Sequence, residues 1–265
     1  QNMIYDAFNG DADGICALHQ LRLAEPIDST LITGVKRDIG LLKQIDAVAG
    51  DEITALDIAV EKNAAALAAF LEKGVKVRWF DHHNPGELPV HPNFHASIDT
   101  AADVCTSLLV DRHLNGKHRI WAVTAAFGDN LHAAARAAAA PLALSDAQLD
   151  QLRELGECIN YNGYGDSLAD LHFHPAELYR LLHPYSDPFA FMRESAAFKT
   201  LSQGYAADMA NARASEPYEA RAGGAVFVLP DAAWARRVSG VCANDLATAH
   251  PDRAHALLTR SPRGH

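Results

Sequence analysis

The fold is decided by residues 75–84, which have the sequence VKVRWFDHHN. The first six of these residues predict a buried strand, and that strand runs directly into Asp81. Residues 62–73 before it have helical spacing and end at Gly74, a residue type that favours helix C-caps. Residues 52–56 predict another strand ahead of that helix. Strand, helix and strand in this order are typical of a parallel βαβ unit.

The same alternation extends towards the N-terminus. Residues 3–8 and 30–33 predict two further strands, with a helix over 15–24 between them. A helix over 39–48 is predicted before the strand at 52–56. We therefore predict an α/β fold, a doubly wound parallel sheet with helices on both of its faces.

The pattern changes downstream, where residues 103–157 read as mainly helical. A later strand, helix and strand are predicted over 225–229, 233–248 and 254–260. One such unit of about 40 residues is small for an independent domain, so we expect the second domain to be incomplete. The predicted parts are a main domain over 3–185, a helical linker over 186–222 and part of a small α/β domain over 223–265.

Composition excludes several classes of protein. The chain has 265 residues, 49% of them hydrophobic, and a net charge of −10. An acidic surface argues against stable duplex DNA binding, which needs clustered cations. The four cysteines form no CxxC pair, and no apolar run approaches the roughly 20 residues of a membrane span. We therefore expect a cytoplasmic protein without a membrane partner, while the choice between monomer and homodimer stays open.

Acidic and histidine residues follow several of the predicted strands. Asp11 and Asp13 come after the first strand, Asp57 follows the strand at 52–56, and the Asp81-His82-His83 triplet ends the strand at 75–80. Loops at the carboxyl ends of parallel strands meet at one edge of the sheet, where ligands bind. Asp129, at the end of a helical pattern, is a further candidate.

This set of side chains suits divalent metal ions. Carboxylate oxygens favour Mg²⁺ and Mn²⁺, and added imidazole shifts the preference towards Mn²⁺. A carboxylate from another strand can bridge two ions about 3.5–4 Å apart, which together activate a water molecule and clamp a phosphoryl group. Gly14 leads the chain into a helix whose N-terminus favours phosphate. Each motif alone has a simpler explanation, since Asp-x-Asp-Gly is often a turn and Asp57 could be a helix cap.

Taken in order, the motifs resemble those of the DHH phosphoesterase superfamily, which includes RecJ exonucleases, family-II pyrophosphatases, exopolyphosphatases, oligoribonucleases and cyclic-dinucleotide phosphodiesterases. The resemblance covers about residues 3–180 and rests on four motifs: Asp11-Ala12-Asp13-Gly14, Leu56-Asp57, Asp81-His82-His83 and Gly128-Asp129. It implies a hydrolase with two manganese ions that cuts phosphoester or phosphoanhydride bonds, with Mg²⁺ as the other candidate ion.

The resemblance also implies a role for each matching residue. Asp11 would bind one metal, Asp13 the other, and Asp57 would bridge them. His82 and Asp129 would complete the second ion's shell. The implied catalytic residues are His83, which contacts phosphate or the leaving group, Asp57, and Asp81, which orients the histidines. The candidate substrate-binding residues are His83, Asn9, Lys36 and Arg37.

Two positions depart from the family pattern. Many members have a His where this chain has Ala7, and RecJ-like members have an Asp where it has Asn9. A neutral ligand weakens metal binding, so we expect the first metal site to be the weaker one. Residues 226–260 resemble the start of the family's C-terminal substrate domain, and its usual Gly-rich segment is absent.

Weaker signals lie outside these motifs. His172 and His174 alternate as metal ligands can, and Tyr161 or Tyr164 could stack on a base. Arg236-Arg237 is a candidate phosphate clamp, with an exposed helix face as the other interpretation.

The sequence predicts a manganese-dependent phosphoesterase that hydrolyses phosphodiester or phosphomonoester bonds of nucleotides or short oligonucleotides. The alternatives are a non-catalytic nucleotide-binding module with a degenerate metal site, and a RecJ-like single-strand exonuclease. The acidic charge argues against the exonuclease, which needs a long cationic channel.

Overall fold

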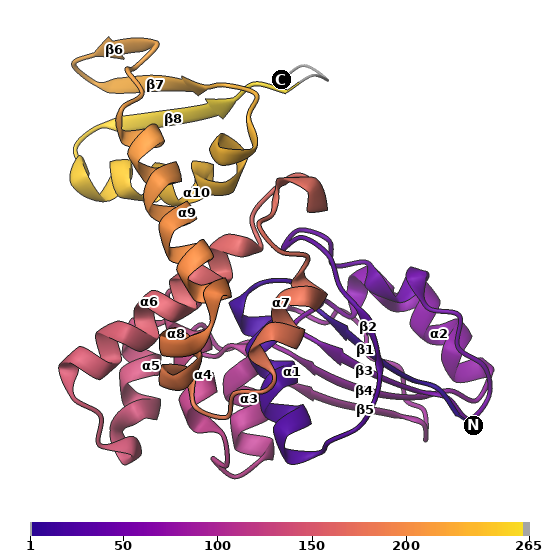
Figure 1. Cartoon of the computed structure of the whole chain (residues 1–265). Coiled ribbons are helices and arrows are strands. Elements are labelled where there is room, and N and C mark those ends of the chain that lie inside the picture. Colours follow the sequence, from indigo (N-terminus) through magenta and orange to yellow (C-terminus); the bar gives the residue numbers. More distant parts are fainter. Residues whose placement is uncertain (1, 262–265) are drawn as a thin grey trace.

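The main domain is built on a five-stranded parallel sheet (Figure 1). The computed structural model describes residues 2–261. The strands are β1 (Ile4–Phe8), β2 (Thr30–Ile32), β3 (Glu52–Leu56), β4 (Lys76–Asp81) and β5 (Phe94–Ile98). Their order is β2-β1-β3-β4-β5, all parallel. This is a doubly wound order, and the chain reverses direction across the sheet between β1 and β3.

Helices cover both faces of this sheet, as Figure 1 shows. One face carries the short turns η1 (Leu41–Gln44) and η2 (Glu61–Asn63) with α2 (Ala64–Glu72). Most helices lie on the other side of the sheet, where α1 and α3 contact the strands and further helices pack on them. They are α1 (Ala12–Ala24), α3 (Thr106–His113), α4 (Arg119–Gly128), α5 (His132–Ala139), α6 (Asp146–Asn162), α7 (Pro175–Leu182), α8 (Pro188–Glu194) and α9 (Ala196–Arg213), with turns η3 (Ala140–Leu142) and η4 (Leu168–Asp170).

Successive side chains of the strands point to opposite faces of the sheet, and each face has its own hydrophobic core. Phe8 and Phe80 point to the helix-rich face and pack in one cluster with Trp121 of α4. Ala7 and Trp79, the neighbouring residues in the same strands, belong to the cluster on the α2 side. Burial on both faces explains why these strands read as nearly continuous apolar runs. The predicted α/β fold is confirmed.

Two local predictions were wrong. Residues 39–48 form only the short turn η1 instead of a helix. Asn63 explains this, because its side chain accepts a hydrogen bond from the Leu42 amide and donates one to the Ile39 carbonyl, replacing helical partners. The sequence analysis also missed β5, an edge strand whose middle residues are exposed.

A second, smaller sheet follows α9 and lies apart from the first in Figure 1. It contains β6 (Glu219–Arg221), β7 (Gly224–Leu229) and β8 (Ala254–Thr259) in the order β6-β7-β8, with α10 (Ala233–Ala249) joining the parallel pair β7 and β8. The strand β6 lies inside the segment predicted as linker. Residues 262–265 of the predicted C-terminal domain lie outside the described residues.

Two arginines of α10 tie this unit to the main domain. Arg236 donates to both carboxylate oxygens of Asp170 at 2.9 and 2.8 Å. Arg237 donates to Asp208 of α9 at 2.7 and 3.1 Å and to the Asp170 carbonyl at 2.7 Å. Both guanidinium groups are therefore engaged within the protein, which corrects their interpretation as a phosphate clamp. Within residues 2–261, no helix is long and apolar enough to span a membrane.

Candidate metal centre

The loop after β1 places two carboxylates at the carboxyl edge of the sheet. Asp11 caps the N-terminus of α1, where its Oδ1 accepts a hydrogen bond from the Gly14 amide at 3.0 Å. Asp13 lies in the first helical turn and is buried. A Cβ on Gly14 would lie 2.1 Å from the Asn9 carbonyl oxygen, so only glycine permits this tight entry into the helix. The loop geometry therefore fixes both carboxylates.

Asp13 is oriented by the N-terminus of α3. Its Oδ2 accepts from the Thr106 amide at 2.8 Å, and its Oδ1 accepts from the Ser107 amide at 2.7 Å. Amide donors and the positive end of a helix dipole both stabilise an ionised carboxylate. Asp13 Oδ2 also lies 3.8 Å from His82 Nε2, so this carboxylate borders the histidine that follows β4.

Asp57 follows β3 and has a left-handed backbone, with φ of 59°. Its Oδ1 accepts from the Thr106 hydroxyl at 3.1 Å and lies 3.2 Å from His82 Nε2. Burial, together with the charges of Asp13 and Asp11, raises the pKa of Asp57 well above its ordinary value. A residue held in this uncommon conformation beside other carboxylates is typical of a functional site.

The residues after β4 complete the edge. His82 contributes its Nε2 to the acidic side chains, while His83 Nδ1 lies 2.6 Å from Asp81 Oδ1. That hydrogen bond raises the pKa of His83. Asp81 is fully buried, so it holds the His83 ring from beneath the surface of the site.

Asp129 reaches the same place from the C-terminus of α4, which ends at Gly128. Burial and the neighbouring Asp13 and Asp11 raise the pKa of Asp129 to about 6. Ligand atoms of Asp13, His82 and Asp129 lie within 4.8 Å of one another, and so do those of a second group, Asp57, His82 and His83. The structure thus places His83, to which the sequence analysis gave no metal role, among the potential ligands.

The predicted cations of this edge have different surroundings. Lys36 Nζ lies 2.6 Å from Asp11 Oδ2 and 3.7 Å from Asp129 Oδ1, inside the acidic cluster. Although burial alone lowers the pKa of Lys36, the charge of Asp11 raises it above its ordinary value. Arg37 instead pairs with Asp166 at the exposed surface, at 2.8 Å.

Other residues singled out from the sequence have structural partners. Tyr161 is only 1% exposed, so stacking on a base is excluded for it, whereas Tyr164 is partly exposed beside Lys36. His172 Nε2 lies 2.7 Å from the Tyr161 hydroxyl oxygen. His174 caps α7 by accepting from the Ala176 amide at 3.1 Å. Neither histidine belongs to a potential ligand group within residues 2–261.

The donor set fits a divalent cation. Carboxylates from three separate loops lie close to the His82 imidazole. Burial, followed by the charges of the neighbouring carboxylates, raises the pKa of Asp57 and of Asp129. Among the described residues, Asn9 Oδ1 and Asp81 Oδ2 are also buried without a hydrogen-bond partner. Oxygen donors with one imidazole suit Mg²⁺ or Mn²⁺, and the bound cation would relieve the repulsion.

A large cleft opens from this edge towards the second sheet. Its volume is about 1490 Å³, and Lys36, Asp129 and Tyr164 line its inner end. The far wall includes Phe227 of β7 and Leu257 of β8. Asp129 belongs to a potential ligand group and also lines the cleft, so the cleft borders the candidate metal centre. A substrate in it could contact both units.

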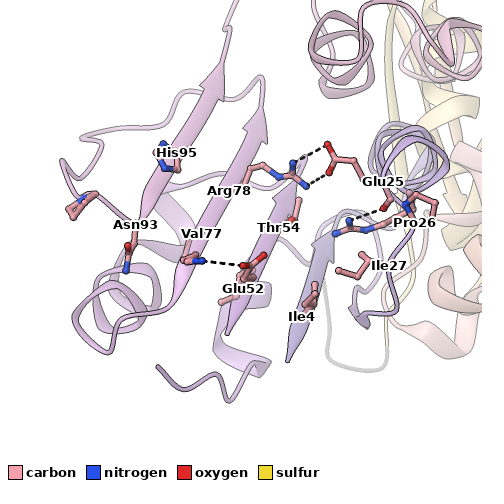
Figure 2. A pocket seen from close by; sticks show the side chains of 14 residues that line it. Ile4, Glu25, Pro26, Ile27, Glu52, Thr54, Val77, Arg78, Asn93 and His95 are labelled. Carbon is pink, nitrogen blue, oxygen red and sulfur yellow. Dashed lines mark hydrogen bonds and ion pairs between the residues drawn. The ribbon is translucent and has the colours of Figure 1, made fainter. Parts of the chain in front are cut away.

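A second hollow of about 500 Å³ lies at the opposite end of the sheet, where the strands begin (Figure 2). It is lined by Ile4, Glu52 and Val77, and Arg78 makes two hydrogen bonds there with Glu25. The charged side chains of this hollow form ion pairs, Arg78 with Glu25 and Lys76 with Glu52. The hollow is separate from the acidic edge and is not part of the candidate site.

No protein-family model matches the sequence, and no curated protein matches it. Solved structures do match. The exonuclease RecJ bound to manganese has a TM-score of 0.56 and 18% identity, over 97% of this chain and 75% of that one. RecJ from Thermus thermophilus in complex with Mn²⁺ scores 0.59 at 20% identity, over 97% and 43%.

A third match is the DHH domain of a member of a family of ribosomal proteins. Its TM-score is 0.61 at 12% identity, over 98% of this chain and 72% of that one. The chain spans less than half of the Thermus protein, and all three identities are low, so the likeness concerns the fold. The chain therefore has the fold of the DHH-domain proteins, the superfamily that its motifs resemble.

Proposed function

We propose that this protein is a divalent-metal-dependent phosphoesterase. The observation that carries the proposal is a pair of potential ligand groups at the carboxyl edge of the sheet. Asp13, His82 and Asp129 form one of them, and Asp57, His82 and His83 form the other. Structural ion-pair networks also bring charges together, but their charges balance. Here Lys36 brings a single ammonium group to four carboxylates, and the excess of negative charge favours a divalent cation.

The side chains have separable tasks. Asp13, Asp57, His82 and Asp129 would hold the ion, which supplies a water of lowered pKa and neutralises charge on the phosphate. His83, whose pKa is raised by Asp81, would donate a hydrogen bond or a proton to a phosphate or leaving-group oxygen. The N-terminus of α1 presents further amide dipoles at the same edge.

The cleft supports nucleotides or short oligonucleotides as substrates. Its volume exceeds the roughly 300–1,000 Å³ of common small-molecule sites. Partly exposed Tyr164 lies at the inner end, where it could stack on a base. Contacts of this kind, away from the scissile bond, would align the phosphate with the metal.

The charges of the cleft support a short substrate over a long single strand. The cationic lining residues are Lys36, Arg153 and Arg213, and the acidic ones are Asp129, Glu154, Glu157 and Asp245. A channel for a long single strand needs an excess of cations along its length. RecJ, which has this fold, is an exonuclease by name, so nucleic acid remains the substrate class we infer.

Hydrolysis of a chromogenic phosphodiester with Mn²⁺ or Mg²⁺ tests the proposal. His82→Ala and Asp57→Asn should each reduce turnover by about 10²-fold or more, since both remove donors to the ion. His95→Ala, at the exposed opposite end of the sheet, is the matched control and should retain activity. Full activity in His82→Ala, or activity unaffected by removing divalent ions, would overturn the proposal.

A further inference from the structure

Lys36 occupies a position that the side chains around it would otherwise offer to a cation. Its Nζ lies 2.6 Å from Asp11 Oδ2, 3.7 Å from Asp129 Oδ1 and 3.3 Å from Asn160 Oδ1. The ammonium group thus has three oxygen neighbours from three different loops or helices. The ammonium donates hydrogen bonds to Asp11 and Asn160 and forms a longer ion pair with Asp129.

The backbone of Lys36 is held where this contact requires it. Its amide donates to the Gly163 carbonyl at 2.8 Å, and its carbonyl accepts from Asn9 Nδ2 at 3.1 Å. An aspartate at position 9 could not donate this second hydrogen bond. Asn9, the residue that departs from the family pattern as a metal ligand, therefore acts here as a support for Lys36.

Asp11 lies close enough to Asp57 and Asp129 for its charge to contribute to their raised pKa, but both of its oxygens have other partners. The two potential ligand groups in residues 2–261 include Asp13, Asp57 and Asp129, and neither includes Asp11. One Asp11 oxygen is taken by Lys36 and the other by the Gly14 amide. Both groups share His82.

We propose that the Lys36 ammonium replaces one of the two metal ions implied by the motifs, so that the centre holds a single divalent ion beside a built-in cation. The inference rests on the proposed function, because it concerns the same site. The ion would lie among Asp13, Asp57, His82 and Asp129. Lys36 neutralises Asp11 on the other side and presents a fixed positive charge towards a bound phosphate.

Counting bound manganese tests this directly. After equilibrium dialysis at saturating Mn²⁺, the protein should contain one ion per chain. In Lys36→Met, which keeps the length of the side chain but removes its charge, Asp11 becomes available and the content should rise to two. Lys76→Met is the matched control, because Lys76 is exposed at the start of β4, the opposite end of the sheet, and its content should stay at one.

Electron paramagnetic resonance of the unmodified protein gives a second readout that needs no variant. An isolated Mn²⁺ is expected, without the exchange coupling that ions about 3.5–4 Å apart would show. Coupled manganese in the unmodified protein, or equal manganese content in it and in folded Lys36→Met, would overturn the inference. The proposed function fails separately, if the unmodified protein binds no divalent ion or does not hydrolyse phosphodiesters.

Discussion

At the scale of single residues, Asp57 combines a left-handed backbone with a buried carboxylate. Asparagine tolerates positive φ better than most residues, so Asp57→Asn should keep the loop conformation while removing the charge. Loss of a supporting contact around a metal typically reduces affinity 10–100-fold, and loss of a ligand should reach at least about 10²-fold. Calorimetric titration with Mn²⁺ measures this. Unchanged affinity would remove Asp57 from the centre.

His83 gives a prediction about pH. Asp81 raises the pKa of His83, so the protonated ring persists to higher pH than an ordinary histidine. If that ring acts as an acid, activity falls as pH rises through its pKa, and Asp81→Asn should move this fall to lower pH. His83→Ala should lower kcat about 10²-fold and abolish the fall. Rate profiles between pH 5 and about 10 test both, and an unshifted profile in Asp81→Asn would contradict the assignment.

Most residues of the edge could be predicted because each directly follows a strand or ends a helix. Asp13, Asp57 and His82 needed only the positions of β1, β3 and β4. The role of Lys36 could not be predicted in this way. Its contact with Asp11 depends on the path of the chain after β2, and on a backbone partner, Gly163, more than a hundred residues away. The sequence predicted that Lys36 lies at the carboxyl edge of the sheet, but it did not predict the contact with Asp11 among the carboxylates.

At the scale of elements, the interface of α1 with the chain after α7 contains a buried histidine. His19 is fully buried; its Nε2 lies 2.7 Å from the Tyr185 carbonyl oxygen, and Trp121 packs on its ring. Burial lowers the pKa of His19 to about 3. The folded protein therefore holds it neutral, whereas the unfolded chain protonates it near its ordinary pKa of about 6.5.

His19 therefore makes the stability of the protein depend on pH. The unfolded state binds a proton that the folded state does not, so His19 reduces stability progressively as pH falls from about 6.5 to about 3. His19→Gln removes this titration and should flatten that part of the profile. Urea unfolding at several pH values measures it. His95→Ala, which changes an exposed histidine, should leave the slope unchanged; an equal slope in His19→Gln would contradict the account.

The elements themselves were predictable where burial on two faces gives continuous apolar runs, as in β3 and β4. Two failures have physical causes. The segment at 39–48 has helical spacing, but the side chain of Asn63 takes its backbone hydrogen bonds. The strand β5 pairs along one edge only, and its exposed middle residues lack an apolar signal.

At the scale of the whole molecule, the second sheet is held against the main domain by a buried ion pair. Arg237 of α10 contacts Asp208 of α9 and the hydroxyl of Tyr161 in α6. Arg237→Met would leave the buried Asp208 carboxylate without its cationic partner, while the Tyr161 hydroxyl still donates to it. Removing one partner of a buried ion pair typically costs about 3–5 kcal/mol. We expect the two units to loosen, so that KM for short oligonucleotides rises while turnover of a small generic phosphodiester changes little.

Proteolysis and kinetics on the same variant check this expectation. Cleavage between α9 and β6 should become faster in Arg237→Met. Arg112→Met is the control, because its pair with Asp99 at 3.0 Å is exposed, lies away from the cleft and contributes little. Equal rises of KM for small and oligonucleotide substrates would mean that the second sheet does not contribute to substrate binding.

The central claim is that a divalent ion binds at the carboxyl edge of the sheet, and anomalous diffraction tests it most directly. Crystals grown with Mn²⁺, measured at the manganese absorption edge, would show where the metal lies. The account predicts an anomalous peak within bonding distance of His82 Nε2 and carboxylate oxygens of Asp13, Asp57 or Asp129. A map without a peak there, from protein that has been saturated with Mn²⁺, would contradict it.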